Sequence, residues 1–180
     1  MRTAIVFESM YGNTHHIANA IAEELREFGP VNVVPAHAAN TDLIAVDLLV
    51  VGGPTHAHGM SRPSTRQAAA ENVTKPDFQL TLDPDAIGDG VREWLEAVRS
   101  GGTSAAAFDT RVDMMPALTG RASRGIAKLL RRHGFELVVP PESFLVSKET
   151  HLEPGEEEHA RTWARQVGAL ASTRLASFSE

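Results

Sequence analysis

Short apolar runs alternate with longer segments of helical period along most of this sequence. The runs are short enough to be buried strands, and they cover residues 4–7, 31–34, 48–51, 105–108 and 137–139, with 144–146 extending the last run after a Pro-Pro break. Between the runs, apolar residues recur at every third or fourth position, which is typical of one face of an amphipathic helix. The helices predicted in this way cover residues 17–28, 63–72, 91–98, 126–130 and 163–170.

The alternation of buried strands with helices predicts an α/β fold, in which helices cover both faces of a parallel sheet. Residues 73–87 show no clear period and are expected to form a loop. No repeat or low-complexity tract divides the chain, so we expect one domain that spans residues 1–180. Sheets of this kind bind ligands beyond the carboxyl ends of their strands. The segments after the first, third and fourth strands are therefore the candidate binding loops.

The composition narrows the class of function. The 17 Lys and Arg against 23 Asp and Glu give a formal net charge of −6, which argues against binding to nucleic acid or to an anionic membrane. The chain has no cysteine, so a redox role needs an organic cofactor or a metal held by other ligands. No apolar stretch reaches the roughly 18 residues of a membrane-spanning helix, and the N-terminus shows no signal-peptide pattern. We expect a cytoplasmic protein with no membrane and no nucleic acid among its partners.

The first candidate loop, Ser9–Thr14, joins a strand to a helix and is rich in hydroxyl and amide groups. The start of a helix presents free backbone N–H groups and a partial positive charge, which together form a ready anion site. Gly12 allows a close approach of the backbone or a positive φ. The loop has no Lys and no G-x-G-x-x-G pattern, so it fits neither a nucleoside-triphosphate loop nor a dinucleotide fold. Two interpretations remain: a phosphate site made of neutral groups, or a helix cap formed by Asn13 or Thr14.

The sequence of this loop, SMYGNT, resembles the S/T-x-x-G-N-T phosphate loop of flavodoxin-like proteins. The segment VVGGPTHAHGM, after the third strand, is similar to the second flavin loop of the NAD(P)H:quinone reductase branch, which has a Gly-x-Pro-Thr pattern. The two motifs stand in the order that this family has. The resemblance implies a flavodoxin-like three-layer α/β sandwich, with five parallel strands in the order 2-1-3-4-5 and helices on both faces. It also implies that the protein binds FMN without a covalent bond.

The resemblance places FMN on three segments of the chain. The phosphate would bind the first loop, and the flavin ring would lie between residues 54–59 and residues 108–111. Backbone groups of Thr55–Gly59 would contact the ring edge. The residues implied as cofactor-binding are Ser9, Met10, Tyr11, Gly12, Asn13, Thr14, Pro54, Thr55, His56, Ala57, His58, Gly59, Phe108, Asp109, Thr110 and Arg111. No side chain is required as an acid or a base, so no catalytic residue is predicted.

The histidines of these loops admit other interpretations. His56 and His58 could bind a metal, yet a His-x-His pair supplies two ligands, and no Asp or Glu lies between residues 48 and 70. No metal is therefore predicted, and both histidines could also be solvated loop residues. His15 and His16 begin the first helix, and we expect at most one of them to approach the phosphate.

The third segment departs from the pattern of classical flavodoxins, which hold the flavin ring between a Trp and a Tyr. It offers no aromatic residue beyond Phe108, which the alternation places at the end of the strand. Trp94 and Trp163 lie in helical patterns and are predicted to be core residues. The flavin would therefore be less shielded than in a dedicated electron carrier.

Arg111 has two interpretations. It could form a surface ion pair with Asp109 or Asp113, which is the common situation of such an arginine. Alternatively, its guanidinium could lie near the pyrimidine side of the flavin. A cation there stabilises the anionic reduced flavin and raises its reduction potential.

Three functions are compatible with the resemblance. The missing aromatic shields and the Gly-x-Pro-Thr pattern favour an FMN-dependent oxidoreductase of the NAD(P)H:quinone reductase type, or a related flavin reductase, which takes hydride from NAD(P)H and reduces a quinone or a similar small acceptor. The first alternative is a flavodoxin-type electron carrier that docks with a protein redox partner. The second alternative is an interaction module that has kept the flavodoxin fold and lost the flavin. The sequence leaves open whether the chain is a monomer or a homo-oligomer.

Overall fold

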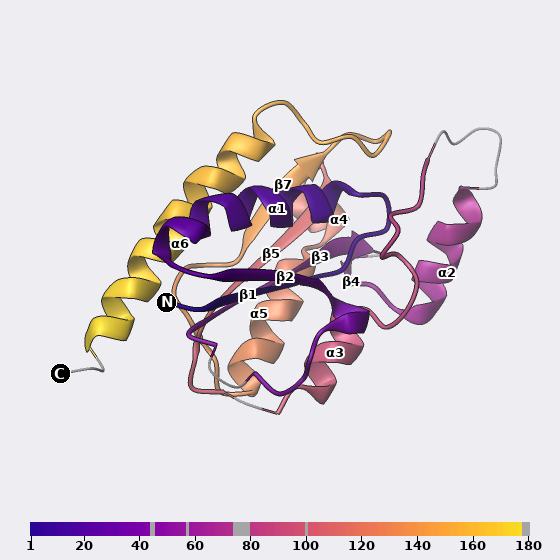
Figure 1. Cartoon of the computed structure of the whole chain (residues 1–180). Coiled ribbons are helices and arrows are strands. Elements are labelled where there is room, and N and C mark those ends of the chain that lie inside the picture. Colours follow the sequence, from indigo (N-terminus) through magenta and orange to yellow (C-terminus); the bar gives the residue numbers. More distant parts are fainter. Residues whose placement is uncertain (44–45, 57, 74–79, 100, 178–180) are drawn as a thin grey trace.

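A computed structural model of the chain shows a central sheet with helices on both faces (Figure 1). The structure describes residues 1–43, 46–56, 58–73, 80–99 and 101–177. The strands are β1 (Thr3–Phe7), β2 (Val31–Pro35), β3 (Leu48–His56), β4 (Gly59–Met60), β5 (Ser104–Val112), β6 (Glu136–Leu137) and β7 (Glu142–Val146). The helices are α1 (Asn13–Leu25), α2 (Pro63–Asn72), α3 (Val91–Ala97), α4 (Pro116–Thr119), α5 (Ala122–Arg132) and α6 (Glu156–Ser177), with 3₁₀ turns η1 (Arg26–Phe28) and η2 (Ala36–Ala38).

The sheet has β3 at its centre. Strands β2, β1, β3 and β5 lie side by side in that order and run parallel. Both β6 and β7 pair with β5, at Ser104–Ala105 and at Phe108–Val112 respectively, so they form one edge strand with a break at Pro140-Pro141. With this broken strand counted as the fifth, the predicted order 2-1-3-4-5 is confirmed. The short β4 folds back on the end of β3 in antiparallel pairing.

Alternation along the strands divides the core into two layers. Ile5 and Phe7 of β1 face the layer that contains α1 and α6, whereas Val6 faces the layer that contains α3 and α5. Trp163 lies in the first layer and Trp94 in the second, and each is at most 5% exposed. The prediction that both tryptophans are core residues is therefore confirmed.

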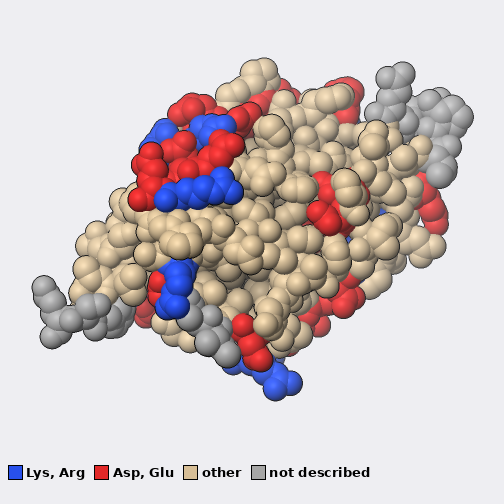
Figure 2. Space-filling model, in the orientation of Figure 1, with Lys and Arg blue, Asp and Glu red and all other residues tan. Residues whose placement is uncertain are grey.

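Charged side chains join the outer faces of α1 and α6. Figure 2 shows acidic and basic groups gathered over these two helices. The ion pairs between the helices join Arg161 to Glu23 and Glu24, and Arg165 to Glu24. Exposed pairs of this kind contribute about 0–1 kcal/mol each. The buried apolar contacts between the helices and the sheet are therefore the main source of stability in this layer.

Strands β3 and β5 both extend beyond the apolar runs that predicted them. They remain paired from Gly52 with Phe108 to Pro54 with Thr110. Beyond this, the end of β3 pairs with β4 up to His56, and the end of β5 pairs with β7 up to Val112. The expectation that a binding loop begins directly after the run at residues 105–108 is therefore wrong, because β5 continues through Val112. A polar residue continues a strand wherever the neighbouring strand supplies backbone partners, and a search for apolar runs does not detect this pairing. Only glycine fits at position 52, where β3 pairs with Phe108 of β5, because a Cβ on Gly52 would lie 2.0 Å from Cζ of Phe108.

Candidate functional site

The first loop lies between the end of β1 and the start of α1. Gly12 immediately precedes α1 with a φ of 90°, a left-handed conformation that favours glycine. Its backbone N–H donates to the hydroxyl oxygen of Ser9 at 3.1 Å. No side chain caps the helix. The first turn of α1 therefore presents backbone N–H groups that its own side chains do not satisfy.

Asn13 and Thr14 bond to distant parts of the chain instead of capping the helix. The side-chain amide of Asn13 donates to the carbonyl oxygen of Thr150 at 2.7 Å. The hydroxyl of Thr14 lies 2.7 Å from the hydroxyl of Thr110, with which it shares a hydrogen bond. The prediction that one of these residues caps α1 is therefore wrong. Both side chains serve to connect the loop to β5 and to the segment that follows β7.

A cavity of about 110 Å³ opens beside the first loop. The first loop, the end of β3 and the end of β5 all contribute to its wall, so the structure brings the three predicted segments together. The lining residues are Ser9, Met10, Tyr11, Asn13, Thr14, Pro54, Thr55, His56, Thr110, Arg111, Val112, Val146 and Thr150. The sequence did not indicate the last two as lining residues, because Val146, which ends β7, and Thr150, which follows it, come from the far end of the chain.

Phe108 and Asp109 do not line this cavity. Phe108 is fully buried, with its ring edge-to-face to Phe144 and Trp163 at centroid distances of 5.9 and 6.2 Å. The carboxylate of Asp109 is also buried and accepts a hydrogen bond of 2.7 Å from the backbone N–H of Ser123 at the start of α5. Burial raises the pKa of Asp109, and the Ser123 N–H opposes that shift.

Arg111 is held at the cavity wall by backbone carbonyls. Its Nη1 donates to the carbonyl oxygens of Met114 at 2.7 Å and Val112 at 3.2 Å. Only 8% of the residue is exposed, and its Nε has no hydrogen-bond partner among the described residues. Within the described chain it forms no ion pair with Asp109 or Asp113, so the surface ion-pair interpretation is wrong.

His56 ends β3 and lines two cavities, the one described above and a second, larger one. Burial lowers the pKa of His56; the charge of Glu8 opposes this shift and that of Arg66 adds to it. The imidazole is therefore neutral near pH 7. His58 lies in the following turn with a φ of 74° and is exposed.

Two buried charged residues, Glu8 and Arg66, lie near His56 at the end of β3, and the sequence patterns did not predict this arrangement. Glu8 follows β1 and accepts a hydrogen bond of 3.0 Å from the backbone N–H of Val91. Arg66 of α2 contacts Glu93 of α3 at 3.1 Å. Both Glu8 and Arg66 are less than one-tenth exposed. The one local signal was a charged residue directly after the first apolar run.

The second cavity has a volume of about 460 Å³. It lies between the β3–β4 turn, the start of α2 and the side chain of Arg92. Its lining residues are His56, His58, Gly59, Met60, Arg62, Ser64, Thr65 and Arg92. The predicted residues His58 and Gly59 therefore face this cavity and not the first one. The predicted residue Ala57 lies outside the described part of the chain.

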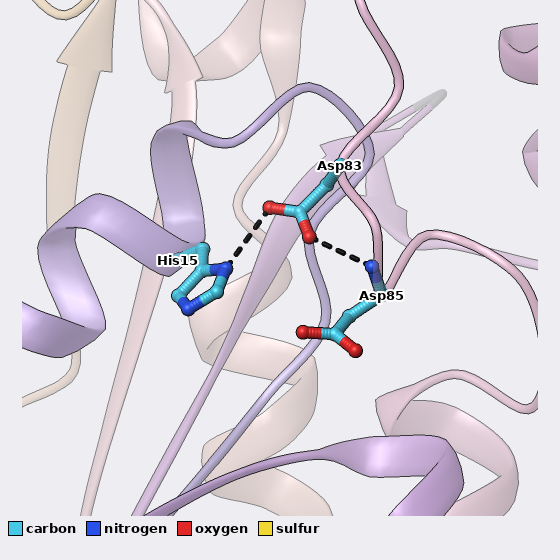
Figure 3. A group of neighbouring side chains, drawn as sticks. All are labelled: His15, Asp83 and Asp85. Atoms are coloured by element: carbon cyan, nitrogen blue, oxygen red, sulfur yellow. Dashed lines mark hydrogen bonds and ion pairs between the residues drawn. The ribbon is translucent and has the colours of Figure 1, made fainter.

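His15, in the first turn of α1, lies close to Asp83 and Asp85 (Figure 3). Nδ1 of His15 lies 3.2 Å from a carboxylate oxygen of Asp83, whose other oxygen accepts the backbone N–H of Asp85 at 2.9 Å. The ligand atoms of the three residues lie within 4.8 Å of one another and could hold a metal ion. The backbone N–H of Asp83 also donates to the carbonyl oxygen of Met10, which fixes this segment against the loop. His16 faces α6 instead.

The comparisons with known proteins agree on one fold. A family model described as flavodoxin matches residues 5–107. A flavodoxin from the domain Archaea is 19% identical, with a TM-score of 0.66, and the match covers 96% of this chain and 99% of that one. Flavodoxin 1 from Bacillus cereus is 18% identical, with a TM-score of 0.65 and coverage of 93% and 97%.

A further solved structure, described as a flavodoxin, WrbA-like protein from Agrobacterium tumefaciens, is 21% identical with a TM-score of 0.60, and the match covers 96% of this chain and 98% of that one. No curated protein matches the sequence. Within the described residues, no helix is long and apolar enough to cross a membrane.

Proposed function

Because the chain belongs to the flavodoxin family of FMN-binding flavoproteins, we propose that it is an oxidoreductase that binds FMN non-covalently and passes electrons from NAD(P)H to a quinone or a similar small acceptor. The observation that carries the proposal is the convergence of the first loop, the end of β3 and the end of β5 on one cavity. When bound, FMN supplies the redox chemistry through its ring, so the protein needs no acid or base of its own.

The first loop fits a phosphate group. The uncapped start of α1 supplies backbone N–H donors and the positive end of a helix dipole. The side chains of Ser9, Asn13 and Thr14 line the same space and add neutral hydrogen-bonding groups. The left-handed Gly12 turns the chain into the helix at this point. The loop can therefore hold the FMN phosphate by hydrogen bonds, without a Lys or Arg of its own.

The wall formed by the ends of β3 and β5 suits a flavin ring with one side little covered. Pro54, Thr55, Thr110 and Arg111 lie on this wall. Among the described lining residues, Tyr11 is the one Phe, Tyr or Trp, and its hydroxyl is bonded to the carbonyl oxygen of Ala69. Tyr11 alone does not enclose both faces of a flavin ring, and a face that no aromatic side chain covers can receive a second flat molecule. This supports a reductase acting on a small acceptor over a carrier that works through a protein partner.

FMN binding is tested by the absorption spectrum of the purified protein, before and after addition of FMN. We expect bands near roughly 375 and 450 nm, as for any oxidised flavin. Replacement of Ser9 by Ala removes the hydroxyl that organises Gly12 and should weaken FMN binding by about three- to tenfold. The matched control is Ser177→Ala, at the exposed end of α6. A colourless protein that does not bind added FMN would instead support a flavin-free interaction module.

The enzyme proposal is tested by steady-state oxidation of NAD(P)H with a soluble quinone, with free FMN at the same concentration as the reference. We expect turnover well above that of free FMN. If the FMN-bound protein shows no such turnover and yet accepts electrons from a flavoprotein reductase, the protein is an electron carrier and the enzyme proposal fails.

A further inference from the structure

The second cavity has an unusual charge for this protein. The chain as a whole carries a formal net charge of −6. The described residues that line the cavity nevertheless include Arg62 and Arg92 and no Asp or Glu. Neither arginine forms an ion pair within the described chain, whereas the neighbouring Arg66 is neutralised by Glu93. Two uncompensated guanidinium groups on one concave surface attract an anion.

The position of Arg92 is fixed before any ligand arrives. Its Nε donates to the carbonyl oxygen of Ser61 and its Nη2 to that of Met60, both at 2.9 Å. The guanidinium is thereby held at the wall of the cavity, and its Nη1 takes part in neither bond. A donor that is already held in place loses little conformational entropy on binding a ligand.

Another part of the wall is formed by Arg62, Ser64 and Thr65 at the start of α2. The backbone N–H of Arg62 donates to the hydroxyl of Thr65 at 2.9 Å, so the backbone conformation here does not depend on the Arg62 side chain. That side chain is exposed. Ser64 adds a hydroxyl group to the same wall. Planar guanidinium groups and hydroxyls are the side-chain donors that suit phosphate oxygens.

The second cavity adjoins the first through one residue. His56 lines both of them, and its pKa is lowered by burial, so the imidazole between the two spaces is uncharged. A molecule whose anionic part lies near Arg62 and Arg92 can therefore extend past His56 toward the proposed flavin ring without meeting another charge at that residue.

We propose that the second cavity binds a phosphate group of the nicotinamide nucleotide that donates electrons to the flavin. This inference rests on the proposed function, which supplies the nucleotide. Arg62 and Arg92 are specificity-determining residues in this proposal, because they select a phosphorylated donor over an uncharged one. The phosphate group is either the pyrophosphate that NADH and NADPH share or the 2′-phosphate that NADPH alone carries.

The test compares KM for NADPH and for NADH in the FMN-bound protein and its variants. Arg62→Ala should raise KM for NADPH by about tenfold with little change in kcat, because it removes one charge-assisted contact. Arg62→Glu should raise KM further, and Arg62→Lys should restore part of the affinity. Arg131→Ala removes the same charge from an exposed position at the end of α5 and should leave KM unchanged.

The two nucleotides separate the possible phosphate groups. An equal rise of KM for both donors assigns the cavity to the pyrophosphate, and a rise for NADPH alone assigns it to the 2′-phosphate; either result supports the proposal. If Arg62→Ala and Arg62→Glu leave both KM values unchanged, the proposal is wrong.

A binding experiment keeps this test independent of turnover. Inorganic pyrophosphate is titrated calorimetrically into the FMN-saturated protein, and we expect binding that Arg62→Glu abolishes and Arg131→Ala preserves. If the protein shows this binding but no NAD(P)H oxidation, the anion cavity stands and the proposed oxidoreductase function fails. Pyrophosphate binding that is equally strong in Arg62→Glu would show that the cavity is not the site.

Discussion

The burial of Phe108 permits a test that separates a core residue from a cofactor-binding one. The side chain is fully buried, and its ring contacts two other rings at 5.9 and 6.2 Å. Substitution by Leu keeps an apolar side chain at the position but loses both ring contacts, which contribute about 0.5–1.5 kcal/mol each. The remaining change in packing adds a smaller cost, since even Phe→Ala costs about 3–5 kcal/mol in a core. We therefore expect Phe108→Leu to lower the free energy of unfolding by about 2–3 kcal/mol.

For a chain of this size, a loss of 1 kcal/mol in unfolding free energy lowers the melting temperature by about 2–4 °C, so the melting temperature of the variant should be about 5–10 °C lower. Stability is measured by thermal and urea unfolding, and FMN affinity is measured by titration at a temperature well below the unfolding transition. FMN affinity should stay within about threefold of the starting protein, since the ring does not line the cavity. Thr110→Val is the comparison, because this residue does line the cavity. A tenfold loss of FMN affinity in Phe108→Leu, with unchanged stability, would refute the assignment of Phe108 to the core.

Three further predictions concern Gly12, Arg111 and Asp109. Gly12→Ala should lower the free energy of unfolding by about 1–2 kcal/mol, because a φ of 90° is strained for any residue with a Cβ. It should also weaken FMN binding. Urea unfolding and FMN titration measure the two effects, and equal stability of the variant and the starting protein would contradict the first. Arg111→Gln should lower the midpoint potential of bound FMN, because it removes the cation from the cavity wall. A redox titration measures this potential, and an unchanged value would contradict the role of Arg111 in raising it. Burial raises the pKa of Asp109, so the native state holds the proton more tightly than the unfolded state, and this residue lowers stability as pH rises above 3.8, the ordinary pKa of the carboxyl. The unfolding free energy of the protein should therefore fall relative to that of Asp109→Asn between pH 4 and pH 7. Urea unfolding at several pH values measures this difference, which would stay constant if the pKa of Asp109 were the same in the native and unfolded states.

The positions of the strands along the chain were predictable from local patterns, because each buried strand leaves an apolar run, whereas their order in the sheet was implied by the resemblance to flavodoxin-like proteins. Even the break in the edge strand was visible, since Pro140 and Pro141 cannot donate to a sheet. The extents of β3 and β5 were not predictable, because Gly52–His56 and Asp109–Val112 become strand only through pairing with each other and with β4 and β7. Strand length is decided by the partner strand as well as by the sequence of the strand itself.

The candidate site, like the strands, was predictable where its residues are adjacent in sequence and not where they meet only in the folded chain. The motif SMYGNT located the first loop, because its residues are adjacent in sequence. The partners of Asn13 and Glu8 were not predictable, since they lie 137 and 83 residues away. A preference for capping is a local tendency, and a buried long-range hydrogen bond overrides it. The second cavity was missed for the same reason, because Arg62 and Arg92 lie far apart in the sequence and meet only in the folded chain.

The hydrogen bond between Asn13 and Thr150 has a consequence for the order of events during synthesis. The cavity wall includes residues from Ser9 to Thr150, so a growing chain cannot complete it while the last strand is still inside the ribosome. Contacts between residues so far apart in sequence form late in folding, after local helices and neighbouring strands. Cofactor capture is therefore a final step of assembly, and a chain released before Thr150 would keep the phosphate motif and yet lack the site.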